Sequence, residues 1–400
     1  MRHAPAGDCP DASPFADRVQ IAATRDIASL EAVWRGFETT AVGHVFQTYD
    51  FMSTWCARVA PGDEIEPVIV TGTASDGKVL FLLPLGVRRK LGSRTVEWLG
   101  GAQADYLGGL YDADYLKYLS DDTSTFERFV DAFVDAIGGA DLLHFTKMPA
   151  DYGGTPNPFL RAETYPNANG AHATHLAPDW DTYYKAKRKS GWRRTDRSKE
   201  RQLSELGEVS FVIADRHETV DEILDTLFQQ KREWLAGIGV DDMFAPEGVA
   251  DFYRSYAHDS LDRGGNVQLS ALYCGDRIAA ASYGLVFRGT YYYILHSYDP
   301  TPELADKSSG RQLMYRLMQW CFDNGITVMD FTIGDESYKD SWCELQLDLV
   351  DAAIPLTRGG SVSSRAVRLW QHTKRQIKKD ETLWSAAVGL RKALKALKRG

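Results

Sequence analysis

The chain carries the same kind of two-residue turn signal once in each half, and this repetition limits the folds open to it. Asp76-Gly77 separates two apolar runs in the first half, and Gly275-Asp276 separates two in the second. Such dipeptides join antiparallel strands in tight hairpins. Residues 143–146 (LHFT) also parallel residues 329–332 (MDFT). The sequence therefore predicts an α/β (α+β) protein made of two divergent copies of one domain, each a mixed twisted sheet flanked by helices.

The expected elements follow the same order in both copies. The first copy is predicted to have strands at 19–23, 66–71, 78–88, 95–99, 107–110 and 141–146, and helices at 27–38, 49–59 and 123–137. The second is predicted to have strands at 209–214, 267–274, 277–287, 291–298 and 327–333, and helices at 219–234, 246–262 and 308–324. We place the domains at 18–150 and 180–357, with a disordered N-terminus at 1–17, a linker at 151–179 and a basic helical tail at 358–400.

Composition excludes several classes of protein. Hydrophobic residues make up 44% of the chain and charged residues 25%, which is typical of a globular protein with room for two cores. Residues 1–17 lack the apolar segment of a signal peptide, and the most apolar stretch, 79–87, is too short to span a bilayer. We therefore expect a cytoplasmic protein. The five cysteines are scattered and never form a Cys-x-x-Cys pair, so we expect neither a disulfide framework nor a metal site.

The helix expected at 308–324 begins in a way that suits an anionic ligand. Its first turn contains no acid, so its free backbone N–H groups can meet an anion, although Ser-Ser-Gly is also ordinary capping chemistry. The corresponding helix in the first copy opens with Asp121-Asp122, which would repel phosphate. We therefore assign cofactor binding to the second copy. The candidate cofactor-binding residues are Lys307, Ser308, Ser309, Gly310 and Arg311.

Polar and aromatic side chains crowd the turn that follows the strand at 327–333. Active-site groups favour such strand ends. The candidate substrate-binding residues there are Asp335, Glu336 and Trp342, and the candidate catalytic residues are Asp330, Lys339, Tyr338 and His296.

These candidates are open to different interpretations. For a general base we compare His296, Asp330, Asp335 and Glu336, and we favour Asp330, because burial in its apolar run would raise its pKa. The alternative is a carboxylate that pairs with a core arginine or caps a turn. His296 lies on a Tyr-rich strand, where a packed core histidine is the more common outcome.

Lys339 follows Tyr338 in the same turn. Its ammonium could hold an anionic group of the substrate or stabilise a developing oxyanion, and the alternative is a surface lysine in a charged turn.

Several short runs carry a resemblance to a known family. These are residues 295–299 (LHSYD), 308–310 (SSG), 330–334 (DFTIG) and Tyr338-Lys339 followed by Trp342. In order and spacing they resemble the GNAT acyltransferases, specifically the CelD-type branch associated with cellulose and exopolysaccharide biosynthesis, which is related to the Fem aminoacyl ligases. The resemblance covers about residues 20–355.

The resemblance implies tandem GNAT-like domains, of which the first is degenerate. It also implies an N-acyltransferase that uses acetyl-CoA or another acyl-CoA as co-substrate and a sugar, envelope or exopolysaccharide-related amine or hydroxyl as acceptor. In this family an oxyanion is held where two parallel strands splay apart, here 291–298 and 327–333.

The sequence also departs from the family pattern. The usual phosphate loop, Gln/Arg-x-x-Gly-x-Gly/Ala, is reduced to Ser309-Gly310. A Fem-like aminoacyl ligase and a non-catalytic accessory protein of a polysaccharide machine therefore stay as alternatives. The basic segment 185–201, with Tyr184 and Trp192, precedes the second copy's first strand, whereas Fem ligases insert their helical arm within that domain. Such a basic, aromatic segment could bind nucleic acid or a phosphorylated substrate. Because the body of the chain is acidic, we favour a solvated helix that packs by Tyr184, Trp192 and Leu203, and we expect no nucleic-acid partner.

Charge is unevenly distributed along the chain. Residues 361–400 contain eleven Lys and Arg but only two acids, although the whole chain has a formal charge of −9. We expect two helices there, 363–379 and 382–399. The second has an apolar side formed by Leu383, Leu390, Leu394 and Leu397. It could lie peripherally on the inner face of an anionic membrane or dock onto the acidic body of its own chain.

Overall fold

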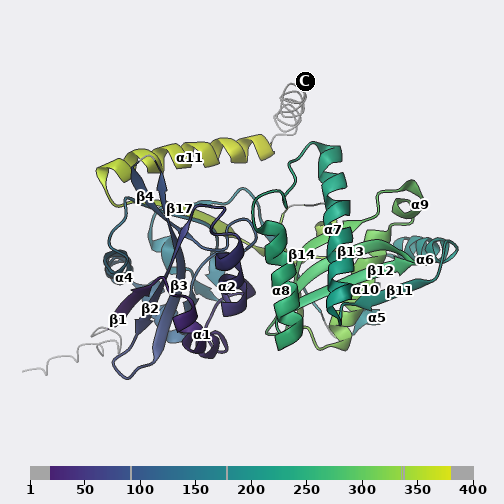
Figure 1. The fold of residues 1–400 in the computed structure, drawn as a ribbon, viewed down its shortest axis with the longest axis horizontal. Coiled ribbons are helices and arrows are strands. Elements are labelled where there is room, and N and C mark those ends of the chain that lie inside the picture. Colours follow the sequence, from purple (N-terminus) through teal and green to yellow (C-terminus); the bar gives the residue numbers. More distant parts are fainter. Residues whose placement is uncertain (1–18, 91, 177–178, 335, 337, 380–400) are drawn as a thin grey trace, which may run out of the picture.

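The computed structural model describes residues 19–90, 92–176, 179–334, 336 and 338–379. Figure 1 shows two lobes side by side, each built on a twisted sheet, with α11 (Arg358–Lys379) lying across the first. The predicted mixed α/β architecture is confirmed.

The first lobe contains the N-terminal copy. Its elements are β1 (Gln20–Thr24), α1 (Glu31–Glu38), α2 (Tyr49–Arg58), β2 (Glu66–Thr73), β3 (Val79–Lys90), β4 (Ser93–Trp98), β5 (Leu110–Tyr111), α3 (Ala113–Asp121), α4 (Thr123–Ala136) and β6 (Leu142–Pro149). The predicted hairpin joins β2 to β3, and Gly77 takes the positive φ of +91° that its turn requires. The sequence prediction missed α3, which begins where the Asp112 carboxylate caps the backbone N–H of Tyr115 at 3.2 Å. The strand expected at 107–110 is reduced to β5.

The second lobe repeats this order. Its elements are α5 (Trp180–Lys187), α6 (Ser190–Ser204), β11 (Val209–Ile213), α7 (His217–Ile238), α8 (Val249–Arg263), β12 (Val267–Cys274), β13 (Arg277–Phe287), β14 (Thr290–Tyr298), α9 (Pro302–Ala305), α10 (Ser309–Asp323) and β15 (Val328–Ile333). The second predicted hairpin joins β12 to β13. α10 ends at Asp323, and Gly325, with a φ of +69°, closes it as expected.

The two lobes exchange their last strands. The remaining strands are β7 (Asp151–Tyr152), β8 (Thr155–Pro156), β9 (Thr164–Pro166), β10 (Ala171–His175), β16 (Leu345–Leu347) and β17 (Leu349–Pro355). β10 follows the first copy in sequence but pairs with β15 of the second sheet, and β17 follows the second copy but pairs with β6 of the first. Residues 151–179 thus contribute strands to both sheets, so they do more than link two domains. The lobes cannot separate without breaking both ladders.

A bulge near the end of the last strand marks equivalent positions in the two copies. Lys147 in β6 and Thr332 in β15 have positive φ values of +52° and +56°, and the pairing with β17 and β10 slips at these places. Lys147 therefore corresponds to Thr332. The sequence match of 143–146 with 329–332 is off by one residue, because letter matching ignores where the bulge adds a residue.

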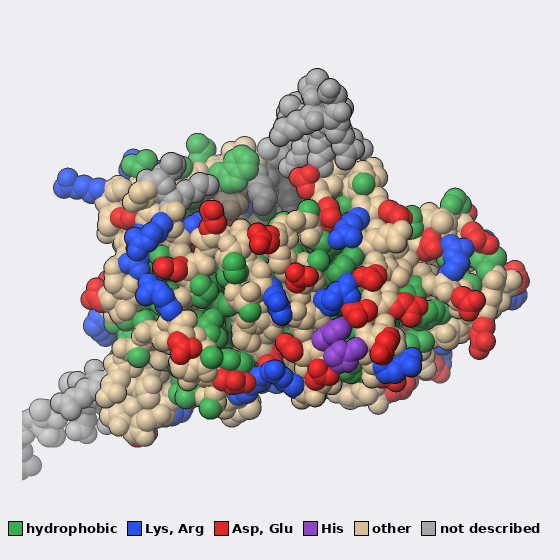
Figure 2. Space-filling model, viewed as in Figure 1, with side chains coloured by type: hydrophobic (Ala, Val, Ile, Leu, Met, Phe, Trp, Pro, Cys, Tyr) green, Lys and Arg blue, Asp and Glu red, His purple; other side chains and the backbone are tan. Residues whose placement is uncertain are grey.

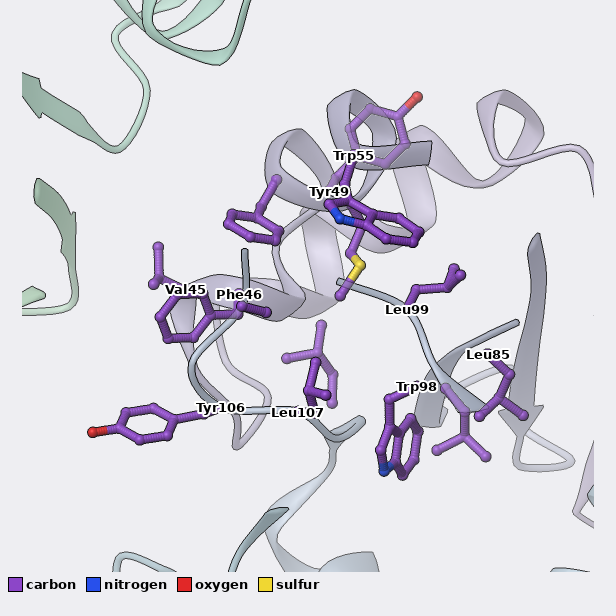
Figure 3. Close-up of a cluster of buried hydrophobic side chains, with 14 of the residues drawn as sticks. Val45, Phe46, Tyr49, Trp55, Leu85, Trp98, Leu99, Tyr106 and Leu107 are labelled. Carbon is purple, nitrogen blue, oxygen red and sulfur yellow. The ribbon is translucent and has the colours of Figure 1, made fainter. Parts of the chain in front are cut away.

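A hydrophobic core runs through both lobes. Figure 3 shows its aromatic part in the first lobe, where Phe46, Trp55 and Trp98 are buried and the hydroxyl of Tyr106 extends away from the cluster. Between the lobes the rings of Phe51 and Phe252 meet with centroids 5.2 Å apart. The two copies therefore share one continuous hydrophobic core.

The tail is described only in part. α11 agrees with the first predicted tail helix, whereas the second, at 382–399, and the N-terminus expected to be disordered lie outside the described residues. Within the described ranges, no helix combines the length and apolar character needed to cross a bilayer.

Candidate active site

The predicted pair of parallel strands, β14 and β15, forms the centre of the second lobe. They pair only from Thr290 opposite Val328 to Tyr292 opposite Asp330. Beyond that point β14 continues to Tyr298 and β15 to Ile333 as partners of other strands. The strands therefore splay apart, and backbone groups that face the opening can bind a reacting carbonyl oxygen.

A cavity of about 840 Å³ opens beside this splay. Its walls come from β14, the start of α10, the α5–α6 junction and the turn around residue 340. Tertiary structure thus brings together seven of the residues singled out in the sequence: His296, Ser308, Ser309, Gly310, Arg311, Tyr338 and Trp342.

The start of α10 presents free donors to the cavity. Ser308 has a positive φ of +59°, and its side chain does not cap the helix. The hydroxyl of Ser309 is buried and has no hydrogen-bond partner among the described residues. In the first lobe the equivalent helix α4 is capped by Asp122, which accepts a 2.8 Å hydrogen bond from the Thr125 N–H. Only the second copy therefore offers this helix start to an anion.

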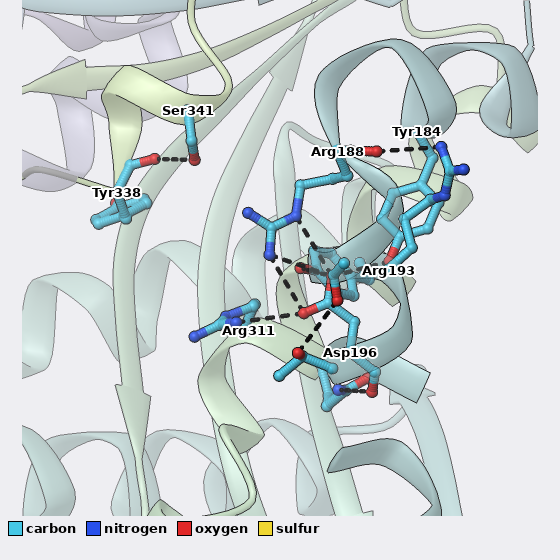
Figure 4. Close-up of polar contacts among 11 residues, drawn as sticks. Tyr184, Arg188, Arg193, Asp196, Arg311, Tyr338 and Ser341 are labelled. Carbon is cyan, nitrogen blue, oxygen red and sulfur yellow. Dashed lines mark hydrogen bonds and ion pairs between the residues drawn. The ribbon is translucent and has the colours of Figure 1, made fainter. Parts of the chain in front are cut away.

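Two arginines near this helix start are held by one buried acid (Figure 4). Asp196 of α6 is only 4% exposed, and it lies 3.1 Å from Arg188 and 3.2 Å from Arg311. Tyr184 and Tyr315 donate hydroxyl hydrogen bonds of 2.9 Å and 2.8 Å to the same carboxylate. The acid is fully engaged, so it fixes the two guanidinium groups at the cavity wall.

The basic segment 185–201 contributes to the site, contrary to its interpretation as a solvated helix. It forms two helices that break at Arg188 and Lys189, which both line the cavity. Leu203 packs inside as expected, but Trp192 is 53% exposed and stands at the cavity with the Arg188 guanidinium 5.0 Å from its ring centre. The signal in the sequence was Asp196, an acid with Arg193, Arg194 and Arg197 close to it in the chain.

Aromatic side chains line the cavity next to the splay. The rings of Tyr293 and His296 stack 5.1 Å apart, and the ring of Tyr338 lies 6.1 Å from that of His296. Burial, with the nearby Lys231 and Lys339, lowers the pKa of His296 to about 3. His296 is thus a neutral, packed histidine, as the alternative interpretation held. Burial raises the pKa of Tyr338, so its phenol stays protonated and can donate a hydrogen bond.

Asp330 does not line this cavity. It is 4% exposed, and its Oδ1 accepts hydrogen bonds from the Tyr106 hydroxyl at 2.8 Å and the Thr332 N–H at 2.7 Å. Burial raises the pKa of Asp330 to about 7, against the lowering effect of these two bonds. Its partner is therefore a phenol of the first lobe, and no arginine of the described residues contacts it. Its bond to the Thr332 N–H, two residues along the chain, caps the turn at the bulge, as the other half of the alternative interpretation held.

One family model matches most of the second copy. Residues 190–340 match an acetyltransferase (GNAT) domain model. No curated protein matches the chain by sequence.

Two solved structures share the fold over most of the chain. One is titled as the crystal structure of FemX, with a TM-score of 0.56 and 11% identity over 80% of this chain and 95% of that one. The other is a conserved protein of unknown function from Bacteroides thetaiotaomicron VPI-5482, with a TM-score of 0.51 and 10% identity over 84% of this chain and all of that one. Because both sequence identities are this low, the similarity shows a shared fold alone.

Lys339 is buried, so the surface-lysine interpretation is wrong. It is 2% exposed, and its ammonium donates to the carbonyl oxygens of Thr332, Ile333 and Gly334 at 3.1 to 3.4 Å. It also lies 2.9 Å from a carboxylate oxygen of Glu336. These hydrogen bonds hold the turn after β15 in its conformation. Lys339 is not among the side chains that line the cavity.

The other site residues predicted from the sequence have different positions. Trp342 is 2% exposed and lines the cavity, whereas Lys307 is half-buried and is not part of the lining. Asp335 lies outside the described residues. No cluster of three or more His, Cys, Asp or Glu suited to a metal occurs in the described part of the chain.

Proposed function

We propose that the GNAT domain of this protein transfers an acyl group from an acyl-CoA, with acetyl-CoA as the simplest donor, to an amine or hydroxyl. The observation that carries the proposal is the cavity itself. It joins an uncapped helix start, flanked by Arg188 and Arg311, to the splay between β14 and β15. An elongated donor with phosphates at one end and a thioester at the other fits this arrangement.

The phosphate end of the donor would lie at the start of α10. The backbone N–H groups of Ser309 and Gly310 and the hydroxyl of Ser309 would donate to it, and Arg311 and Arg188 would supply positive charge. This set replaces the fuller phosphate loop that the chain lacks.

The chemical step would take place at the splay. The acceptor nitrogen or oxygen attacks the thioester carbonyl, its bond to the acyl carbon forms, and the carbon–sulfur bond breaks. Backbone N–H groups at the splay would stabilise the oxyanion, and the protonated phenol of Tyr338 would donate a hydrogen bond to the leaving thiolate, which takes up a proton from water. Asp330, with its pKa of about 7, is the proposed acceptor of the proton that the incoming nucleophile releases. Because its carboxylate lies outside the cavity lining, the proton would reach it through a bridging water.

The acceptor belongs to the same proposal. The resemblance to the CelD-type branch supports an amine or hydroxyl on a sugar, envelope or exopolysaccharide-related compound. Candidate contacts at the turn after β15 are Glu336 and Trp342, and Asp335 is a candidate from the sequence alone.

A second candidate is a Fem-like aminoacyl ligase. The observation that favours it is the basic wall formed by Lys187, Arg188 and Lys189, which suits the phosphates of an aminoacyl-tRNA end as well as those of CoA. A non-catalytic accessory role is the third possibility from the sequence.

A ligand panel followed by a turnover assay separates these candidates. Thermal unfolding is measured with acetyl-CoA, longer acyl-CoAs, CoA and nucleotide sugars. Thiol release from acyl-CoA and transfer from an aminoacyl-tRNA are then followed with each acceptor that stabilises the protein. We expect acyl-CoA at about 100 times its Kd to stabilise the fold by about 2.7 kcal/mol. Transfer that requires charged tRNA would favour the ligase, and an absence of both stabilisation and transfer would leave the accessory role.

A further inference from the structure

Helix α11 turns its large apolar side chains toward solvent instead of toward the protein core. A surface helix normally turns its apolar stripe toward the core. In α11 the large apolar side chains point outward: Val362 is 70% exposed, Leu369 69% and Trp370 66%. They recur at helical spacing, and Ala366 and Thr373, which are also exposed, lie on the same face of the helix. In Figure 2 hydrophobic side chains stand at the upper left edge, where Figure 1 shows α11.

The inner side of α11 holds the helix to the first lobe mainly through polar contacts. Ser364 is 3% exposed and its hydroxyl donates a 2.8 Å hydrogen bond to the carbonyl of Ala353 in β17. Arg368 donates to the same carbonyl at 3.0 Å and forms an ion pair with Glu163. Gly360 allows a close approach, because a Cβ there would lie 1.8 Å from the carbonyl oxygen of Asp141. The helix is thus anchored without its apolar stripe.

The charged residues of α11 all have the same sign. The helix contains no acid and seven basic residues, which are Arg358, Arg365, Arg368, Lys374, Arg375, Lys378 and Lys379. Arg365 is exposed and flanks the stripe. A second copy of α11 would therefore bring cations against cations, which disfavours pairing of two copies through this face.

We propose that α11 is a membrane-docking surface that recognises an anionic lipid bilayer. Val362, Leu369 and Trp370 enter the boundary between head groups and acyl chains, and the basic residues beside them meet the lipid phosphates. An extended polyanion such as nucleic acid would use the cations but leave the apolar stripe in water. The docked helix places the first lobe against the bilayer.

Vesicle sedimentation with the full-length protein tests this proposal. Vesicles of phosphatidylcholine alone are compared with vesicles that also contain phosphatidylglycerol, at low and high salt. We expect salt-sensitive binding to the anionic vesicles, and we expect the double variant Leu369→Ser/Trp370→Ser to lower it by roughly tenfold or more. Both side chains are exposed, so the variant keeps its fold, which thermal unfolding checks. Val33→Ser/Leu206→Ser changes two exposed apolar residues elsewhere and should bind like the wild type.

Three results would overturn the proposal. The wild type stays in the supernatant with anionic vesicles at low salt, or the Leu369/Trp370 variant sediments as well as the wild type, which would move binding to another part of the chain such as residues 381–400. In the third, the variant alters the oligomeric state in solution while the wild type ignores vesicles, which would assign the stripe to a protein contact. None of these outcomes depends on acyl transfer.

Discussion

The hydroxyl of Tyr106 in the first lobe donates a 2.8 Å hydrogen bond to the Asp330 carboxylate in β15 of the second. The bond joins the copy without the free helix start to the strand beside the candidate active site. It lowers the pKa of Asp330, while burial raises it to about 7. The first copy therefore helps to set the protonation of the residue that we propose as the base.

Asp330→Asn should change how stability depends on pH. The folded-state pKa of about 7 lies above the ordinary 3.8, so the folded protein binds this proton more tightly than the unfolded chain. Asp330 therefore lowers the free energy of unfolding progressively as pH rises from about 4 to 7. The variant should match the wild type near pH 4 and exceed it at pH 8 by at most about 4 kcal/mol. Urea unfolding of both proteins across this range measures the difference.

The same substitution should lower the rate of catalysis, although it raises stability at pH 8. If Asp330 accepts the proton, Asp330→Asn lowers kcat by about 100-fold or more. Tyr106→Phe is the companion variant, because it removes the bond that lowers the pKa, and it should move the ascending limb of the pH–rate profile to higher pH. An unshifted profile in a folded Tyr106→Phe protein would take Asp330 out of the mechanism.

Gly310→Asp should abolish binding of acyl-CoA without harming the fold. A Cβ at Gly310 would meet only ordinary contacts, the nearest at 3.5 Å from Tyr298, and a carboxylate in the first turn favours the helix. The same carboxylate repels the donor phosphates. Gly310→Asn has the same shape without the charge, so it should keep most of the stabilisation by acetyl-CoA. Equal thermal shifts in the two variants would remove the phosphate site from α10.

Lys339→Met should destabilise the protein as well as lower turnover. The ammonium is the donor to three carbonyl oxygens at the end of β15, and its loss should cost about 1–3 kcal/mol. Glu336→Gln removes only the half-exposed ion-pair partner and should cost less than about 1 kcal/mol. Chemical unfolding gives the stability, and kcat/KM gives the turnover. A Lys339→Met protein with wild-type stability would contradict the fastening role.

Asp196→Asn should lower the free energy of unfolding far more than the removal of an exposed acid on the same helix. It leaves the Arg188 guanidinium, 9% exposed, without its counter-charge, and we expect a loss of about 3 kcal/mol or more. Glu200, also on α6, forms an exposed ion pair with Arg316 of α10, and Glu200→Gln should lower the free energy of unfolding by less than about 1 kcal/mol. Comparable losses in the two variants would show that the buried network adds little to stability.

The sequence by itself determined the elements that local chemistry controls. Hairpins at Asp76-Gly77 and Gly275-Asp276, the start and end of α10, and the contrast between its open first turn and the Asp122 cap all follow from residues adjacent in the chain. Periodicity and turn preferences act over a few residues, so they can be recognised without a fold.

Only the tertiary structure decided the contacts between distant segments. It exchanged β10 and β17 between the sheets, turned Asp330 toward Tyr106, buried Lys339 under three carbonyl groups and brought Arg188 to Arg311 through Asp196. These contacts depend on which face of a strand or helix meets which neighbour. A one-residue bulge, as at Thr332, changes that face, and no local pattern in the sequence records it.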